Sequence, residues 1–396
     1  MSWRDIVGNR WVEIDTDAIR HNFARVKELV GPDVHILAVV KADAYGLGAV
    51  ETARVLAEAG ASMLGVTTVD EGVELREFGI ELPILVMSPF LPGEAGLIIK
   101  YNLTPAVSSL GQVEALAGLV QGKGRVPVHL KIETGMGRTG ILPEEAGPFL
   151  EKAASYPEIY LEGIFTHFAR ACQGDSFTKE QFARFGRVLQ KAAELGLEIP
   201  FRHVCNSAAT LDLPEMHLNM VRVGTVLYGQ HPALAKNRLD LKDPWQIKAR
   251  VIHLKEIAAG TSVGYGRDYV AERLTTIAVI PLGWADGLTV MPAIRPKGLP
   301  DLFKMMAKLI LEYLGRSGTV NVTINGKMYP LVGRLGMQLS MVQADEKVKI
   351  GDEVQVNIRR LSTNPRLPRV YFKAGRPYLA RMTSGEWELS APGQTG

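Results

Sequence analysis

Lys41 directly follows an apolar run, in the segment HILAVVKADAYGLGAV at residues 35–50. The run lacks polar alternation, which predicts a strand buried on both faces, as in a parallel sheet. A lysine at the end of such a strand has a lowered pKa where its surroundings are partly dry, and its neutral amine is then a usable nucleophile. The alternative is a lysine that simply reaches solvent where the strand ends. Gly46 and Gly48 then open the backbone ahead of a predicted helix that begins near Ala49.

Other chemically useful side chains also come just after apolar runs. Arg138 is a candidate clamp for an anion, and His167 is a titratable imidazole. The pairs Asn206-Ser207 and Gly224-Thr225 offer groups that suit a phosphate, because hydroxyls and main-chain N–H groups bind an anion without adding competing carboxylates. Each position alone also has a structural explanation. A single histidine, for example, is more often a core residue whose hydrogen bonds are made within the fold.

The elements that carry these residues alternate between strand and helix patterns. Helical patterns such as VDEGVELREFG at 69–79 and the segment 177–196, with Asp175 and Ser176 as capping candidates, separate the strands. An open doubly wound sheet would use the same alternation, but the strand number favours a (β/α)₈ barrel over residues 12–240. Such a barrel carries its site at the carboxyl ends of the strands, where all the candidates above converge. The eight predicted strands are 34–40, 62–68, 83–87, 104–108, 126–132, 160–166, 201–205 and 221–227.

After about residue 240 the alternation stops, and a mostly β-stranded C-terminal domain over 241–396 is predicted, which residues 1–11 would join. One exception is LPDLFKMMAKLILEYLG at 299–315, whose apolar residues recur at helical spacing. Because the opposite face keeps charged residues, it is predicted to be a core-packed or interface helix and not a membrane element. The predicted strands of this domain are 247–257, 275–282, 319–324, 328–334 and 353–359, with a hairpin turn at Asn325-Gly326.

Composition excludes several classes of protein. The formal net charge of +3 is small for 396 residues, so no nucleic-acid partner is indicated. Two cysteines, Cys172 and Cys205, make neither a disulfide framework nor a four-ligand zinc site, so no metal is expected. The first residues carry charges and lack a signal-peptide core, and no apolar stretch approaches the roughly 20 residues that span a bilayer. A cytoplasmic protein without a membrane partner is expected.

An ordered series of short segments resembles the alanine racemase family, whose members are fold-type III enzymes dependent on pyridoxal 5'-phosphate. The resemblance spans nearly the whole chain and both predicted domains. It implies an amino-acid racemase, most simply one acting on alanine in D-amino acid biosynthesis. It also implies a homodimer whose active site is shared across the interface. The matching segments are VVKADAYGLG at 39–48, LKIETGMGRTG at 130–140, FTHFA at 165–169, NSAAT at 206–210, VRVGTVLYG at 221–229, GYGRDY at 264–269, PLGWADGL at 281–288 and, more weakly, VGRLGMQLS at 332–340.

The resemblance also implies a role for each matching residue. Lys41 would join the cofactor covalently, which makes the cofactor an electron sink for the bond broken at the substrate α-carbon. Taken alone, Tyr45 or Tyr228 is more simply explained as an aromatic residue that packs at the rim of the barrel. The residues that would bind the cofactor phosphate or lie beside it are Tyr45, Asn206, Ser207, Gly224, Thr225 and Tyr228.

Arg222 would face the pyridine nitrogen of the cofactor. A guanidinium has no acceptor and keeps its proton, so the ring nitrogen must stay unprotonated. This weakens the electron sink and limits side reactions. Tyr265, from the partner subunit, would be the second base, opposite Lys41, because racemisation needs proton removal on one face and delivery on the other. His167 would hydrogen-bond this tyrosine and lower its pKa. Without the resemblance, Arg222 would be interpreted as a structural residue of an ion pair.

Arg138 would bind the substrate carboxylate, with help from the main-chain N–H of Met337 in the partner subunit. Lys131 matches a lysine that the family can carbamylate. A carbamate would replace a cation by an anion beside Arg138, where two buried positive charges would otherwise repel each other.

Several positions near the substrate entrance depart from the family pattern, so a racemase of a larger or polar amino acid is the alternative. A fold-type III decarboxylase is a more distant rival, because those enzymes place a carboxylate where Arg222 stands. A non-catalytic cofactor-binding protein normally has the barrel alone. The departures are Gln338 for an aspartate, Cys172 for an acidic residue, Trp284 for a tyrosine, Thr289-Val290 for Pro-Arg, and Pro365 for a tyrosine.

Overall fold

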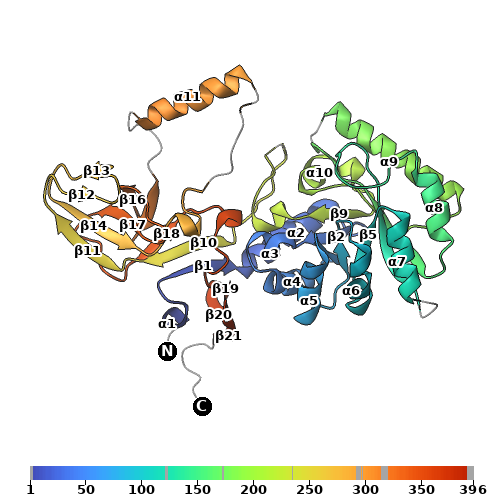
Figure 1. Cartoon of the computed structure of the whole chain (residues 1–396), viewed down its shortest axis with the longest axis horizontal. Helices are drawn as coiled ribbons and strands as arrows, with labels where there is room; N and C mark the ends of the chain where they lie inside the picture. The colour runs from blue at the N-terminus through green and yellow to red at the C-terminus, as the bar shows by residue number, and fades with distance from the viewer. Residues whose placement is uncertain are drawn as a thin grey trace, which may run out of the picture. The chain divides into compact units, whose positions relative to one another are not determined.

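The computed structural model describes residues 3–120, 124–171, 174–233, 235–290, 296, 298–313 and 320–389. The chain divides into two compact units, one of residues 16–244 and one that combines residues 1–15 with residues 245–396 (Figure 1). The boundaries expected at 12 and 240 therefore fall at 16 and 244, and the N-terminal residues join the second unit.

The unit of residues 16–244 contains a closed barrel of eight parallel strands among its described residues. Pairing of β2 with β9 closes the ring, and the apolar runs that predicted these strands are almost wholly buried. Strands buried on both faces cannot alternate between polar and apolar residues, which explains why the runs are continuous. The predicted (β/α)₈ barrel is confirmed. Its strands are β2 (His35–Val39), β3 (Met63–Val66), β4 (Ile84–Val86), β5 (Thr104–Val107), β6 (Val126–Lys131), β7 (Ile159–Phe165), β8 (Phe201–His203) and β9 (Met220–Val223).

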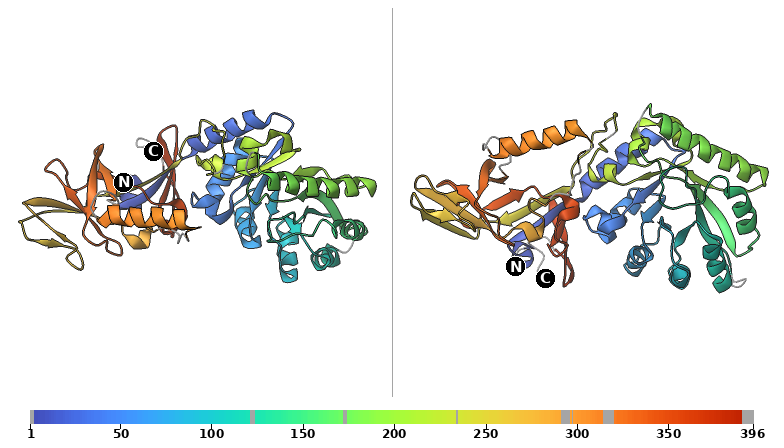
Figure 2. Two further views of the ribbon diagram at one scale, coloured as in Figure 1. Left: turned by 90° about the horizontal axis from the view of Figure 1, so that it is seen from above. Right: turned by 45° about the horizontal axis from the view of Figure 1, so that its top comes forward.

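Helices on the outside of the ring cover these strands (Figure 2). In α9, Asp175 is the N-cap, since its carboxylate accepts the Thr178 N–H at 2.9 Å, while Ser176 is the first helical residue. The α-helices are α2 (Thr16–Val30), α4 (Ala49–Glu58), α5 (Val69–Glu77), α6 (Ala95–Lys100), α7 (Leu110–Val120), α8 (Ala146–Ala154), α9 (Ser176–Glu194) and α10 (Ser207–Asp212). The 3₁₀ helices are η1 (Pro92–Glu94), η2 (Pro214–Met216) and η3 (Thr225–Tyr228).

A left-handed turn, α3 (Lys41–Tyr45), follows β2. The four residues from Ala42 to Tyr45 have φ between 50° and 57°, and Gly46 and Gly48 then lead into α4 at φ 92° and 95°. Left-handed backbone costs an L-residue roughly 1–2 kcal/mol. The two glycines were expected from the sequence, but a left-handed turn built from alanine, aspartate and tyrosine was not.

The second unit is built on a sheet of eleven strands among its described residues. Strand β1 pairs antiparallel with β10 and parallel with β19, and its Trp11, Val12 and Ile14 are fully buried. These two pairings are the reason that residues 12–15 belong here and not to the barrel. In sheet order the strands are β11 (His253–Ile257), β14 (Thr275–Ile280), β17 (Ser340–Ala344), β16 (Lys327–Val332), β15 (Asn321–Ile324), β18 (Glu353–Val356), β10 (Trp245–Arg250), β1 (Arg10–Asp15), β19 (Arg369–Lys373), β20 (Arg376–Met382) and β21 (Gly385–Glu388).

The predicted hairpin at Asn325-Gly326 is confirmed. Ile324 pairs with Lys327, and both turn residues have positive φ, 50° and 78°, as a two-residue hairpin turn requires. The remaining elements of this unit are the hairpin β12 (Ser262–Val263) and β13 (Tyr269–Val270), and the helices α1 (Trp3–Val7), η4 (Trp284–Asp286), α11 (Leu299–Tyr313) and η5 (Arg360–Ser362).

The helix predicted at 299–315 is α11 (Leu299–Tyr313), and residues 314 and 315 lie outside the described residues. Its side chains are not core-packed, because Leu299, Phe303 and Leu309 are 63–69% exposed. None of the helices that the structure describes is long and apolar enough to cross a membrane.

Candidate active site

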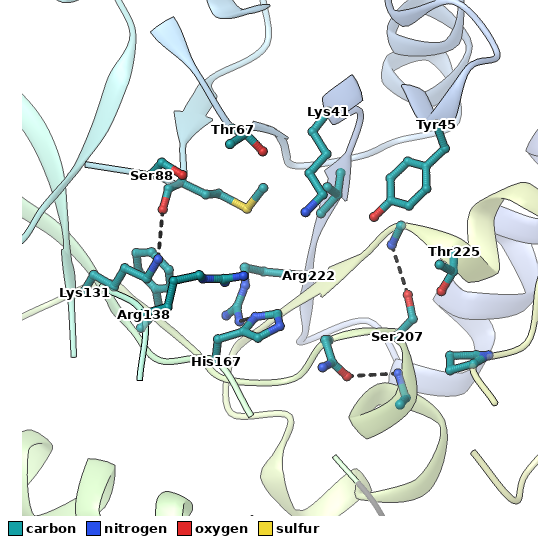
Figure 3. A pocket seen from close by; sticks show the side chains of 17 residues that line it. Lys41, Tyr45, Thr67, Ser88, Lys131, Arg138, His167, Ser207, Arg222 and Thr225 are labelled. Carbon is teal, nitrogen blue, oxygen red and sulfur yellow. Dashed lines mark hydrogen bonds between the residues drawn. The ribbon is translucent and has the colours of Figure 1, made fainter. Parts of the chain in front are cut away.

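A cavity of about 460 Å³ lies within the barrel unit, at the carboxyl ends of the strands (Figure 3). Ten residues singled out in the sequence line it, and they come from five strands or the loops after them. A volume of this size is typical of a site for a small organic molecule. The ten are Lys41, Tyr45, Lys131, Arg138, His167, Asn206, Ser207, Arg222, Gly224 and Thr225; the other lining residues are Val39, Thr67, Met87, Ser88, Phe165, Ala208 and Pro232.

The Lys41 side chain projects into this cavity from the start of the left-handed turn. Burial lowers the pKa of its amine, the positive charge of Arg138 lowers it further, and the charge of Glu71 opposes the shift. A larger share of neutral amine is therefore present at neutral pH than for a solvated lysine.

Hydroxyl groups gather to one side of Lys41, where Figure 3 shows Tyr45, Ser207 and Thr225 together. The Ser207 hydroxyl accepts the Gly224 N–H at 3.0 Å. Gly224 has no room for a side chain, because a Cβ there would lie 2.5 Å from the Tyr45 hydroxyl oxygen. This side of the cavity therefore presents hydroxyls and closely approaching backbone, a combination that suits an anion such as phosphate.

Two members of the predicted phosphate set have other contacts. The Asn206 side chain lines the cavity, but its oxygen accepts the N–H groups of Ala208 and Ala209 as the N-cap of α10. Tyr228 does not line the cavity. It is fully buried, and its hydroxyl donates to the Val39 carbonyl at 2.7 Å while its ring packs 5.1 Å from that of Tyr45. These contacts indicate that Tyr228 supports Tyr45 and β2 and does not bind the phosphate directly.

Arg222 lies beside His167 (Figure 3) and is buried. Its guanidinium donates to the carbonyl oxygens of Thr166, His203 and Val204 and to the His203 Nδ1 atom, at 2.7–3.2 Å. Burial lowers its pKa to about 10, so it stays charged at neutral pH. Among the described residues no carboxylate pairs with it, so its charge is held by these dipoles and by the ring of Phe165, whose centroid lies 5.2 Å from the guanidinium carbon.

A chain of imidazoles continues from Arg222 through the barrel interior. The His203 Nε2 atom lies 2.8 Å from the Nδ1 atom of His129, and the Nε2 atom of His129 lies 3.3 Å from the Glu162 carboxylate. Burial lowers the pKa of both histidines, so both rings are neutral. Sequence reasoning missed this chain, although both histidines stand in the predicted strands.

His167 is also a neutral imidazole. Burial, followed by the charges of Arg222, Arg138, Lys131 and Lys41, lowers its pKa to about 3. Its Nδ1 atom lies 3.4 Å from a donor nitrogen of Arg222, so Nδ1 is the acceptor and Nε2 carries the proton. His167 is therefore a hydrogen-bond donor at Nε2.

Acid should destabilise the barrel through its buried histidines. Their pKa values lie below the ordinary value of about 6.5, so at lower pH the unfolded chain binds protons that the folded chain refuses. Stability is thus lost as the pH falls below about 6.5, by about 1.4 kcal/mol at pH 5.5 for His167 alone. Urea unfolding at pH 7 and 5.5 measures this loss. We expect His167→Asn to reduce the pH dependence and the exposed-residue control His253→Gln to leave it unchanged; an equal pH dependence in all three proteins would contradict the prediction.

Lys131 and Arg138 occupy the side of the cavity away from Ser207 (Figure 3). The Lys131 amine donates to the Met87 carbonyl at 3.3 Å, and burial with the charges of Arg138 and Arg222 lowers its pKa to about 8. Arg138 stands on a loop that the Glu133 carboxylate holds by accepting the N–H groups of Gly135 and Arg138. This side of the cavity is therefore cationic and suits a carboxylate ligand.

Tyr265 and Met337 belong to the other unit, where they line a separate hollow of about 570 Å³. Their side chains are 71% and 58% exposed. Gln338 lines the same hollow, Trp284 on η4 is half exposed, and the carbonyl of Pro365 accepts a hydrogen bond from Arg369. Cys172, the other altered entrance position, lies outside the described residues.

Comparison with known proteins gives one consistent result. Residues 14–232 match the N-terminal domain model of alanine racemase and residues 245–366 match its C-terminal domain model. Alanine racemase of Halothermothrix orenii is 40% identical over 354 residues, covering 87% of this chain and 86% of that protein. Alanine racemase of Desulforamulus reducens is 39% identical, covering 87% and 88%. The structure of alanine racemase from Clostridium difficile 630 superposes with a TM-score of 0.83 at 32% identity, covering 95% of this chain and 98% of that one.

Proposed function

The chain belongs to the alanine racemase family, and from this premise we propose that it interconverts L- and D-alanine by a two-base mechanism with Lys41 and Tyr265 as the bases. Its activity is that of an isomerase. The single observation that carries the mechanism is the cavity itself, which brings a lysine of lowered pKa together with a cluster of cations and a group of hydroxyls.

The family uses pyridoxal 5'-phosphate, and the cavity fits this group. Because Gly224 has no side chain, its backbone lies close to the hydroxyls of Tyr45 and Ser207. These hydroxyls and the nearby backbone N–H groups would hold the phosphate. Lys41 would hold the aldehyde carbon and Arg222 the ring nitrogen. When bound, the cofactor supplies an electron sink that acidifies the substrate α-proton. Because Arg222 stays charged and has no acceptor, it supports a neutral ring nitrogen and so favours racemisation over decarboxylation.

The residues of this chain supply the remaining chemistry. The Arg138 guanidinium would bind the substrate carboxylate and orient the α-carbon, and Lys41 would move the proton on one face. The Tyr265 hydroxyl would serve the other face. His167 supports it, because a neutral imidazole that donates from Nε2 stabilises a tyrosinate and so lowers the pKa of the hydroxyl.

We propose that the working unit is a homodimer in which the partner subunit provides Tyr265 and Met337. Both residues are exposed on the sheet unit, and an exposed tyrosine is a poor base until a second surface dries and orients it.

Lys131 is expected to carry a carbamate, formed when its neutral amine adds carbon dioxide and releases one proton. A pKa of about 8 leaves enough neutral amine for this reaction near neutral pH, and the anion would hold Arg138. With ¹³C-bicarbonate, we expect a carbamate resonance that is absent from Lys131→Ala, together with a KM for alanine about tenfold higher in that variant. The exposed-residue control Lys179→Ala should keep both properties. A wild-type spectrum without the resonance would rule the carbamate out.

Incubation of the purified protein with L-amino acids in deuterated water tests the function. We expect deuterium at the α-carbon of alanine together with D-alanine. Stronger turnover of a larger or polar amino acid would move the substrate assignment to that amino acid, as the altered entrance residues allow. Release of carbon dioxide would instead identify a decarboxylase, and no exchange with any amino acid would leave a cofactor-binding role.

A further inference from the structure

The left-handed turn that carries Lys41 needs an external support. Its residues from Ala42 to Tyr45 are all L-amino acids in a backbone region that favours glycine. Lys41 is the first residue of this turn, so relaxation of Ala42 toward ordinary backbone would redirect the lysine side chain. Within the turn, the Ala44 N–H binds the Val40 carbonyl and the Gly46 N–H binds that of Ala42, but the N–H of Ala42 needs another acceptor.

Glu71 of α5 provides that acceptor. One carboxylate oxygen, Oε1, accepts the Ala42 N–H at 2.6 Å. The other oxygen, Oε2, accepts the N–H groups of Thr67 and Thr68 at 2.7 and 3.2 Å. Capping of α5 explains the Oε2 contacts, because a glutamate three residues into a helix commonly binds the N-cap N–H. It does not explain Oε1, which reaches a residue 29 positions earlier in the chain.

A second carboxylate braces the far end of the same turn. The Oδ1 atom of Asp43 accepts the Ala49 N–H at 2.8 Å, at the first residue of α4. This contact lies within the segment that contains the turn, whereas Glu71 joins the turn to a separate helix. Neither Glu71 nor Asp43 lines the cavity, so neither is placed to touch a bound molecule.

We propose that Glu71 is a positioning residue for Lys41, which holds the left-handed turn in the conformation that aims the amine into the cavity. The inference rests on the proposed function only in that Lys41 is taken as the residue that binds the cofactor. The hydrogen bonds of Glu71 do not depend on that proposal. A carboxylate suits the position since its two oxygens serve two backbone segments at once, whereas the amide of glutamine has a single acceptor oxygen.

The charge of Glu71 provides a second, separable signature. The charged or titratable groups around Lys41 are Glu71 and the cavity-lining residues Arg138, Lys131, His167, Arg222 and Tyr45. Burial and Arg138 lower the pKa of Lys41, and Glu71 raises it. Removal of the Glu71 charge therefore lowers the pKa of Lys41 further, and this change reports the charge of Glu71, whereas the rate of cofactor recapture reports the geometry of the turn.

The test uses the apoprotein, so that it does not depend on racemisation. The Lys41 pKa is read from the pH dependence of acetylation by acetic anhydride, followed by peptide mass spectrometry. The rate of pyridoxal-phosphate recapture is measured well above that pKa, where only geometry matters. For Glu71→Gln we expect a lower Lys41 pKa and recapture about tenfold slower. The matched control is Asp70→Asn, which removes the neighbouring exposed charge of α5 and should behave like the wild type.

A compensating variant tests the geometric part directly. Glycine adopts positive φ without steric cost, so Ala42→Gly in the Glu71→Gln background should restore most of the recapture rate while the Lys41 pKa stays low. The double variant also covers the case in which Glu71→Gln alone does not fold. A wild-type recapture rate in Glu71→Gln would overturn the inference, whatever the Lys41 pKa. A wild-type protein that captures the cofactor on Lys41 but turns over no amino acid would instead overturn the proposed function and leave this inference intact.

Discussion

Lys41→Ala is expected to lose racemisation by at least about 10⁴-fold and to lose the absorbance near about 420 nm of a lysine-bound cofactor. The substitution removes both the covalent anchor and one of the two bases, so the losses occur together. Burial and the charge of Arg138 already make this amine more available than an ordinary lysine amine. Among the described residues, Lys131 is the one other lysine that lines the cavity, and it lies on the side away from Ser207.

Spectra and turnover on the same samples check this result. Lys179→Ala removes an exposed lysine from α9 and should leave both measurements unchanged. Thermal unfolding of the two variants should be similar, because the Lys41 side chain makes no hydrogen bond to the part of the chain that the structure describes. A persistent absorbance band in Lys41→Ala would show that the anchor is a different residue.

Tyr265→Phe is expected to keep the cofactor band and to lose racemisation by about 10²–10⁴-fold, the usual contribution of a positioned acid or base. The phenyl ring remains, so packing in the 570 Å³ hollow changes little. Only the hydroxyl that exchanges the proton is removed. Tyr269→Phe, a few residues away on β13, is the matched control and should retain turnover.

Mixing the two inactive variants tests where Tyr265 comes from. In a mixed dimer of Lys41→Ala and Tyr265→Phe chains, a site that takes its two bases from different chains is intact on one side and doubly defective on the other. Random exchange should then recover about a quarter of wild-type activity. If both bases come from one chain, every site carries a defect and no activity returns, which would contradict the shared site.

Much of the fold was predictable because strand and helix patterns are local. Each barrel strand is a short apolar run, and burial on both faces requires this composition wherever the strand lies in the ring. The same holds for the Asn325-Gly326 turn, since positive φ at two adjacent residues restricts their identity. The predicted boundary at residue 12 failed because β1 is apolar enough for either unit, and only its pairing with β10 and β19 decides.

The sequence by itself therefore determined the barrel, the mostly β second unit and the residue types that meet at the strand ends. Tertiary structure alone decided their states: the left-handed turn under Lys41, the neutral His167, the Arg222 guanidinium held by carbonyls and imidazoles, and the hydroxyl of Tyr228 turned to Val39. The physical reason is distance along the chain. Apolar periodicity is written within a few residues, whereas the partners that set a pKa or support a strained turn, such as His129 and His203, stand 74 positions apart and meet only when the ring closes.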